Sequence, residues 1–217
     1  MLSVSDLHVR IAAATILDGV SLDVAPGSLT ALMGRNGAGK TTFMRSVMGL
    51  IPRSGGSIAF DGGDLGAMPA HARAGLGIGY MPENRRLVPE LTVRENILVP
   101  AWATRIDDAE DRIARIYALM PEVEHLAVRR AMQLSGGQQK LAALARALMT
   151  ATKLVLLDEP FEGVAPALAG RLAEVLLGLK EQGLSVLLSE SDSTHSEDLI
   201  DTAYIIERGR VEARGDA

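Results

Sequence analysis

The chain has 217 residues and no cysteine, so it is long enough for one compact domain with a small subdomain and forms neither disulfides nor cysteine-ligated metal sites. Hydrophobic residues make up 47% of it, which supports a large core, and the formal net charge of -5 argues against broad contact with nucleic acid. No apolar run approaches the about 20 residues that cross a bilayer, and the N-terminus lacks the basic and apolar regions of a secretory leader, so we expect any membrane role to depend on a partner.

Short strands fill much of the first part of the chain. Alternating apolar residues predict strands over 2–7 and 20–24, and the dipeptides at 18–19 and 26–27 predict turns beside them. A further strand is expected over 57–60. This pattern predicts an antiparallel β part ahead of the middle of the chain.

A glycine-rich segment, 34–41, follows the apolar run 29–33 and precedes a helical pattern. Its sequence GRNGAGKT matches the phosphate-binding pattern G-x-x-x-x-G-K-[ST], in which glycines let backbone N–H groups point at phosphate oxygens. We expect Lys40 to reach the β- and γ-phosphates and the Thr41 hydroxyl to hold Mg²⁺. A glycine-rich turn that matches by chance is the alternative, and the flanking strand and helix argue against it. The predicted nucleotide-binding residues are Gly34, Asn36, Gly37, Ala38, Gly39, Lys40, Thr41 and Thr42.

Residues 84–150 differ in character and predict helices. Thr92 with Glu95 three residues later forms a capping-box pattern, which marks a helix start. Apolar residues recur at helical spacing over 107–119, and another helix is expected over 137–149. We interpret this stretch as a helical subdomain inserted in the P-loop domain.

Buried parallel strands are predicted near the C-terminal end. The runs 153–157 and 184–188 are continuously apolar, as in strands covered on both faces. A helix over 166–180 joins them into a βαβ unit, and a last strand is expected over 203–206.

Three further patterns follow the P-loop in order. The segment 134–138 (LSGGQ) precedes a helix, Asp158 and Glu159 end one apolar strand, and 189–192 (SESD) ends another. Taken singly, Ser135 could be an ordinary helix N-cap and the two carboxylates could be solvated charges. Their joint occurrence in this order leaves little room for chance.

This ordered set resembles the ATP-binding subunits of ABC transporters over nearly the whole chain, about residues 2–209. The resemblance implies an α/β fold, a P-loop NTPase domain of ABC type with an inserted helical subdomain and an N-terminal antiparallel β part. It places Walker A at 34–41, the signature at 134–138 and Walker B at 154–159. The single domain would divide into a RecA-like and antiparallel β core, 1–83 and 151–217, and a helical subdomain, 84–150.

The resemblance also implies a head-to-tail dimer with two ATP molecules held between the subunits. The signature of one subunit would contact the γ-phosphate bound to the other, with the helix that follows pointing its positive end at the phosphate. Asp158 would act on Mg²⁺, and Glu159 would polarise the attacking water as general base. The trans signature residues are Ser135, Gly136, Gly137 and Gln138.

Two positions near the nucleotide depart from the common pattern or vary within the family. The aromatic residue that usually stacks on adenine is replaced near Arg10 and Ile11, so we expect Ile11 or the plane of the Arg10 guanidinium to pack on the base. The alternative for Ile11 is a plain strand residue. Glu83 stands where many ABC proteins carry the Q-loop glutamine. We predict a metal site formed by Thr41, Asp158 and Glu83.

Ser191 stands at the position of the switch histidine and completes the predicted catalytic set with Lys40 and Glu159. Its short side chain predicts slow hydrolysis. His195 could substitute for the missing histidine, or it could be a solvated surface residue. Ala165 replaces the D-loop aspartate of many ABC proteins, which also puts the turnover rate in doubt.

Residues 80–96 and 160–166 are similar to stretches of the branched-chain amino acid transporter ATPases and the related urea transporter ATPases. The resemblance implies an ATPase, with ATP and Mg²⁺, that drives import of branched-chain amino acids or a related small polar solute. Its partners would be transmembrane permease subunits, a second identical or homologous ATP-binding subunit and, indirectly, a periplasmic solute-binding protein, but no nucleic acid. The permease would hold it at the cytoplasmic face of the inner membrane.

Three other functions stay open. A soluble ABC ATPase of DNA repair or translation usually carries long insertions or a duplicated domain, for which 217 residues leave no room. A P-loop kinase or GTPase would not need the segment 134–138. A weakly hydrolysing nucleotide sensor is compatible with Ser191.

The sole tryptophan, Trp102, is expected in the core, with a groove that receives a membrane partner as the alternative. Methionines beside the P-loop are interpreted as core filler rather than as a functional surface. These are Met33, Met44 and Met48.

Overall fold

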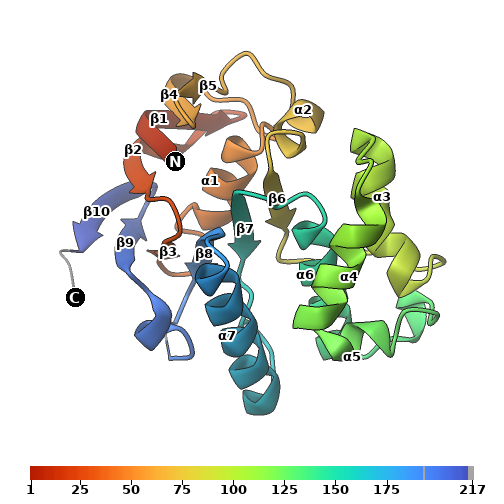
Figure 1. Cartoon of the computed structure of the whole chain (residues 1–217). Coiled ribbons are helices and arrows are strands. Elements are labelled where there is room, and N and C mark those ends of the chain that lie inside the picture. Colours follow the sequence, from red (N-terminus) through yellow and green to blue (C-terminus); the bar gives the residue numbers. More distant parts are fainter. Residues whose placement is uncertain (193, 215–217) are drawn as a thin grey trace.

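The computed structural model describes residues 1–192 and 194–214, which form two β-sheets with helices between and around them (Figure 1). One sheet has four antiparallel strands in the order β2-β1-β4-β5, and the other has six strands in the order β10-β9-β3-β8-β7-β6. The predicted α/β architecture with a separate antiparallel part is therefore confirmed. The strands are β1 (Leu2–Ile11), β2 (Ala14–Val24), β3 (Leu29–Met33), β4 (Gly55–Phe60), β5 (Gly63–Asp64), β6 (Ile78–Met81), β7 (Leu154–Asp158), β8 (Ser185–Glu190), β9 (Thr202–Glu207) and β10 (Arg210–Arg214).

The hairpin of β1 and β2 differs from the prediction of a turn at 18–19. The chain turns at 12–13, where Ala12 has a φ of 52°. Gly19, with a φ of 75°, lies inside β2, next to a shift in the register of its pairing with β1. A glycine at positive φ suits a β-bulge as well as a turn, so the local sequence could not separate the two.

The strands β3, β8 and β7 are parallel neighbours at the centre of the six-stranded sheet. Every residue of β7 and β8 is buried, as the continuous apolar runs predict. Their carboxyl ends meet at one edge, where Asp158 pairs in register with Ser189, and Met33 with Glu190. This edge positions the functional site.

Most of the helices beyond residue 92 form a cluster beside the sheet, with α3 to α5 lying together at the right of Figure 1. At the start of α3 the predicted capping box is confirmed: the Thr92 hydroxyl accepts from Glu95 N at 3.2 Å, and the Glu95 carboxylate accepts from Thr92 N at 2.7 Å. Because α6 packs against both α3 and β6, the division of the chain at 84 and 150 stays a prediction. The helices are α1 (Lys40–Val47), α2 (Ala70–Ala74), α3 (Val93–Thr104), α4 (Ala109–Leu119), α5 (Pro121–Glu124), α6 (Gly136–Leu148) and α7 (Pro166–Glu181), with short 3₁₀ turns η1 (Ala131–Gln133) and η2 (Glu197–Leu199).

Trp102 is 57% exposed, so its predicted core position is wrong. Its helix turns Ile97 and Ala101 towards the core at helical spacing, which leaves the next residue facing outward. None of the helices in the described part of the chain is long and apolar enough to cross a bilayer. The methionine prediction is confirmed, since Met44 and Met48 are buried and Met33 packs against the core.

Candidate functional site

The glycine-rich loop between β3 and α1 curls round the side chain of Lys40. The ammonium donates to the carbonyl oxygens of Gly34 and Arg35, the latter at 3.1 Å. Gly39 has a φ of 116°, and a Cβ on Gly34 would lie 2.3 Å from the carbonyl oxygen of Ile206 in β9. Both positions therefore require glycine. The N-cap of α1 is Gly39, so no side chain caps the first N–H groups of this helix.

A cavity of about 360 Å³ opens over this loop. Gly34 and Ala38 do not line it, because Gly34 abuts β9 and Ala38 is buried in the core. Ile11 is 46% exposed and is not among the described lining residues, whereas Ile16 of β2 is one of them. The role of Ile11 at adenine therefore stays a prediction. The lining residues are Ile16, Asn36, Gly37, Gly39, Lys40, Thr41, Thr42, Glu83 and Glu159.

Asp158 is fully buried at the end of β7, where three hydroxyl groups hold it. Its Oδ1 accepts from Thr41 Oγ1 at 3.1 Å and from Ser189 Oγ at 2.7 Å, and its Oδ2 accepts from Tyr80 OH at 3.4 Å. Burial raises the pKa of Asp158, and the hydrogen bonds from Ser189 and Thr41 oppose that shift by favouring the charged form.

The Asp158 carboxylate and the Thr41 hydroxyl are oxygen donors of the kind that Mg²⁺ takes beside nucleotide phosphates. No cluster of three or more His, Cys, Asp or Glu side chains suited to a metal occurs among the residues that the structure describes. The Thr41 hydroxyl and the Asp158 carboxylate, 3.1 Å apart, fit a magnesium ion that nucleotide phosphates would help to hold.

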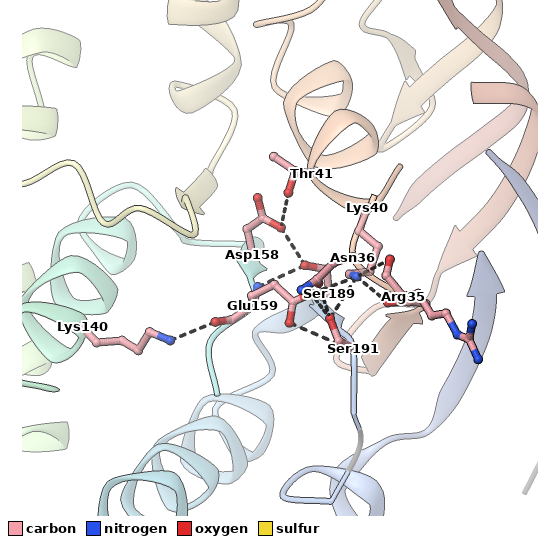
Figure 2. Close-up of polar contacts among 10 residues, drawn as sticks. Arg35, Asn36, Lys40, Thr41, Lys140, Asp158, Glu159, Ser189 and Ser191 are labelled. Carbon is pink, nitrogen blue, oxygen red and sulfur yellow. Dashed lines mark hydrogen bonds and ion pairs between the residues drawn. The ribbon is translucent and has the colours of Figure 1, made fainter. Parts of the chain in front are cut away.

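The side chain of Glu159 lies against the P-loop and Ser191 (Figure 2). Its Oε1 forms an ion pair with Lys40 Nζ at 2.9 Å, and both side chains are buried. Ser191 Oγ donates to the same carboxylate at 2.7 Å, and Ser191 N donates to it at 3.2 Å. The structure thus brings the three predicted catalytic residues into mutual contact, with Ser191 bonded to the carboxylate.

Glu83 follows β6 on an exposed segment and lines the P-loop cavity. Desolvation raises the pKa of Glu83, and the carboxylates of Glu162, Asp158 and Glu159 act in the same direction. Its role as a metal ligand stays a prediction, since the hydrogen bonds described join Thr41 to Asp158 and not to Glu83.

The signature residues begin α6, where they form a second capping box. Ser135 Oγ accepts from Gln138 N at 3.3 Å, and Gln138 Oε1 accepts from Ser135 N at 3.0 Å. Ser135 is therefore a helix N-cap whatever else it does. Ser135 and Gly136 are exposed, and none of the four signature residues is among the described residues that line the P-loop cavity.

Four residues at the site carry no recognisable motif in the sequence. They are Ile16, Tyr80, Lys140 and Ser189. Ser189 Oγ also accepts from Glu159 N at 3.1 Å, so one hydroxyl contacts both the carboxylate of Asp158 and the backbone of Glu159. The sequence does not reveal that Ser189 lies beside Asp158, because this contact arises only when β7 and β8 pair. Lys140 had a signal in the sequence, because it falls on the apolar face of its helix. His195, in contrast, is exposed, and the centroid of its ring lies 6.0 Å from that of the Phe161 ring.

Comparisons with known proteins agree with this geometry. The ABC transporter family model matches residues 17–162. BraG of Pseudomonas aeruginosa, a high-affinity branched-chain amino acid transport ATP-binding protein, is 35% identical over 195 residues, which cover 90% of this chain and 84% of BraG. LptB of Escherichia coli K12, a lipopolysaccharide export system ATP-binding protein, is 37% identical over 202 residues, which cover 92% of this chain and 84% of LptB. The crystal structure of the ADP conformation of MJ1267, an ATP-binding cassette of an ABC transporter, matches 100% of this chain and 91% of its own with a TM-score of 0.87 and 29% identity.

Replacing Lys40 with alanine should weaken Mg-ATP binding about 10- to 100-fold, because it removes a charge-assisted contact worth about 1.5–3 kcal/mol. Titration with a fluorescent ATP analogue measures the affinity. Lys153→Ala changes an exposed lysine that pairs with Asp61 and is the matched control. Binding by Lys40→Ala at the wild-type strength would show that the P-loop assignment is wrong.

Hydrolysis by the isolated chain should be slow, because Ser191 has no imidazole to reach the γ-phosphate. Ser191→His should raise turnover at saturating ATP by about tenfold through an added contact to the developing charge. The gain should vanish in a Glu159→Gln background, since a positioned phosphate still needs a group that orients water. Phosphate release measures all three variants, and unchanged or lower turnover in Ser191→His would identify Ser191 as an ordinary turn residue.

Proposed function

This chain belongs to the ABC transporter family as an ATP-binding subunit with ATPase activity, and we propose on that premise that it drives import of branched-chain amino acids or a related small polar solute. One observation supports the motor role above all others. The P-loop lysine, Thr41, the buried Asp158 and Glu159 come together at one edge of the sheet. That arrangement can bind a nucleoside triphosphate and present a base to water.

Each residue at this edge has a task in the proposed hydrolysis. The loop N–H groups and Lys40 would bind the β- and γ-phosphates, and Thr41 and Asp158 would hold Mg²⁺, which supplies charge neutralisation at those phosphates. Glu159 would orient the attacking water and take its proton. Since Lys40 is paired with Glu159, a phosphate that attracts Lys40 would release the carboxylate for that task.

The second nucleotide contact is proposed to come from another subunit. The signature residues lie at the exposed N-terminal end of α6, outside the cavity lining of their own chain. Backbone N–H groups at that helix end suit a phosphate presented by a partner. We therefore propose a head-to-tail dimer, either with a second copy or with a homologous ATP-binding subunit, which closes on ATP and reopens after hydrolysis.

The permease is proposed to dock at a second hollow of about 490 Å³ beside the nucleotide edge. Apolar side chains of Leu50, Val99 and Pro100 line it together with Arg45 and Arg146. Thr41, Glu83 and Asp158 line the same hollow, so a segment bound there would lie against the proposed metal site. Docking would hold the chain at the cytoplasmic face of the membrane, and a periplasmic solute-binding protein would act only through the permease.

The dimer can be tested with two substitutions. Glu159→Gln keeps the shape of the side chain and removes the base, so ATP should trap a closed dimer about twice the mass of the monomer, visible by light scattering. Adding Ser135→Arg should abolish that shift, because a bulky side chain would fill the γ-phosphate contact. A shift that persists in the double variant would contradict the trans site.

The identity of the solute can be tested by deleting the gene for this chain in the source cells. Uptake of labelled leucine, isoleucine and valine should fall to the background level and return with the wild-type chain, but not with Glu159→Gln. Lys153→Ala should restore uptake fully, since it changes a surface pair remote from the cavity. Unchanged uptake together with a defect in lipopolysaccharide export would contradict the proposed import. It would favour export of lipopolysaccharide, the activity for which LptB is named.

A further inference from the structure

Lys140 is a buried lysine on the inner face of α6. Its side chain is 5% exposed, and it shares that face with the buried residues Ala143, Leu144 and Ala147. Burial lowers the pKa of Lys140 to about 8, because the charged form is desolvated. A charged side chain at such a position is costly, so its contacts need a specific account.

The two contacts of the ammonium join α6 to the turn that carries Glu159. Lys140 Nζ donates to the carbonyl oxygen of Glu159 at 3.0 Å and to that of Glu162 at 2.6 Å (Figure 2 shows the first). Both acceptors belong to the segment between β7 and α7. The ammonium therefore bridges the start and the end of one tight turn.

That turn needs to be held in place. Glu159 has a φ of 50°, in the left-handed region that residues with a side chain rarely adopt and that costs about 1–2 kcal/mol. Its N–H is held by Ser189, and its carboxylate by Lys40 and Ser191. Lys140 holds the remaining polar group of the same residue, its carbonyl oxygen.

We propose that Lys140 is a positioning residue for ATP hydrolysis: its ammonium fixes the 159–162 turn and so couples the placement of the Glu159 carboxylate to the signature at the start of α6. The proposal rests on the proposed function, in which Glu159 orients water and the signature binds a phosphate from the second subunit. Lys140 lies five positions after Ser135 on one continuous helix, about 7.5 Å along its axis. A helix that moves as a rigid body when the signature meets a phosphate must carry Nζ, and hence the turn, with it.

The charges that face the ammonium come from two segments, the one after β6 and the 159–162 turn. Arg85 disfavours its charged form, while Glu162, Glu159 and Glu83 favour it. When the pH rises past about 8 the amine loses its proton. The neutral amine keeps two N–H groups, but it loses the charge that strengthens hydrogen bonds roughly twofold. Turnover should therefore decline over that range in a chain that carries lysine here.

The test compares Lys140→Met, Lys140→Arg and the exposed-lysine control Lys153→Met in the full chain. Lys140→Met should lower kcat about tenfold or more and leave the Kd for a fluorescent ATP analogue unchanged within about twofold. Lys140→Arg keeps a permanent charge and donors, so it should restore most of kcat and remove the decline in turnover above about pH 8. Thermal unfolding of each variant shows whether the fold is retained.

Wild-type kcat in a folded Lys140→Met variant would overturn the inference, and so would a fall in kcat matched by an equal loss of ATP affinity. If Lys140→Met does not fold, the dependence of turnover on pH is the deciding measurement. Parallel pH profiles of turnover for Lys140→Arg and the wild type would overturn the inference. Absence of Glu159-dependent hydrolysis in the wild type would defeat the proposed function and this inference together. Wild-type hydrolysis that Lys140→Met leaves intact would defeat the inference alone.

Discussion

The parallel pairing of β3, β8 and β7 brings the functional groups together. Parallel strands end at the same edge, so the P-loop that follows β3 meets the carboxylates at the end of β7 and Ser191 after β8, although it lies over 100 residues before them in the chain. The register fixes the details. Asp158 lies beside Ser189, and this hydroxyl orders both Asp158 and the backbone of Glu159. A slip of one residue would turn each of these side chains to the other face.

A buried ion pair occupies the centre of that edge. Lys40 and Glu159 are 2.9 Å apart and both buried, where removal of one partner typically costs about 3–5 kcal/mol because the other charge stays buried. A phosphate would replace Glu159 as the partner of Lys40 without leaving either charge isolated, provided that the carboxylate gains water and keeps its hydrogen bonds from Ser191. The same pair can thus hold the site together and yield to the nucleotide.

The helix α6 connects the site with the rest of the molecule. Arg85 donates to the carbonyl oxygen of Gly136 at 3.0 Å near the start of α6, and Arg146 near its end donates to the carbonyl oxygens of Arg85 and Arg86. Arg85 and Arg86 both have positive φ, so these bonds hold a strained segment next to Glu83. With Lys140 bound to carbonyl oxygens of the 159–162 turn, one helix carries the signature at its start and contacts both the segment next to Glu83 and the turn that holds Glu159.

The sequence alone determined the family and the order of the chemical groups, because the P-loop, the signature and the strand-end carboxylates depend on local spacing. The buried strands and the capping box at Thr92 followed from continuous apolar runs and a four-residue pattern in the same way. Prediction failed where one local pattern is compatible with two structures, as Gly19 is with a turn or a β-bulge. It also failed where the buried face of a helix had to be distinguished from the exposed one, as for Trp102. The tertiary structure alone decided that Ile16 lines the cavity, that Ser191 contacts Glu159 and that Lys140 reaches two carbonyl groups. Each of these depends on the three-dimensional approach of segments distant in sequence, which residue spacing along one segment does not encode.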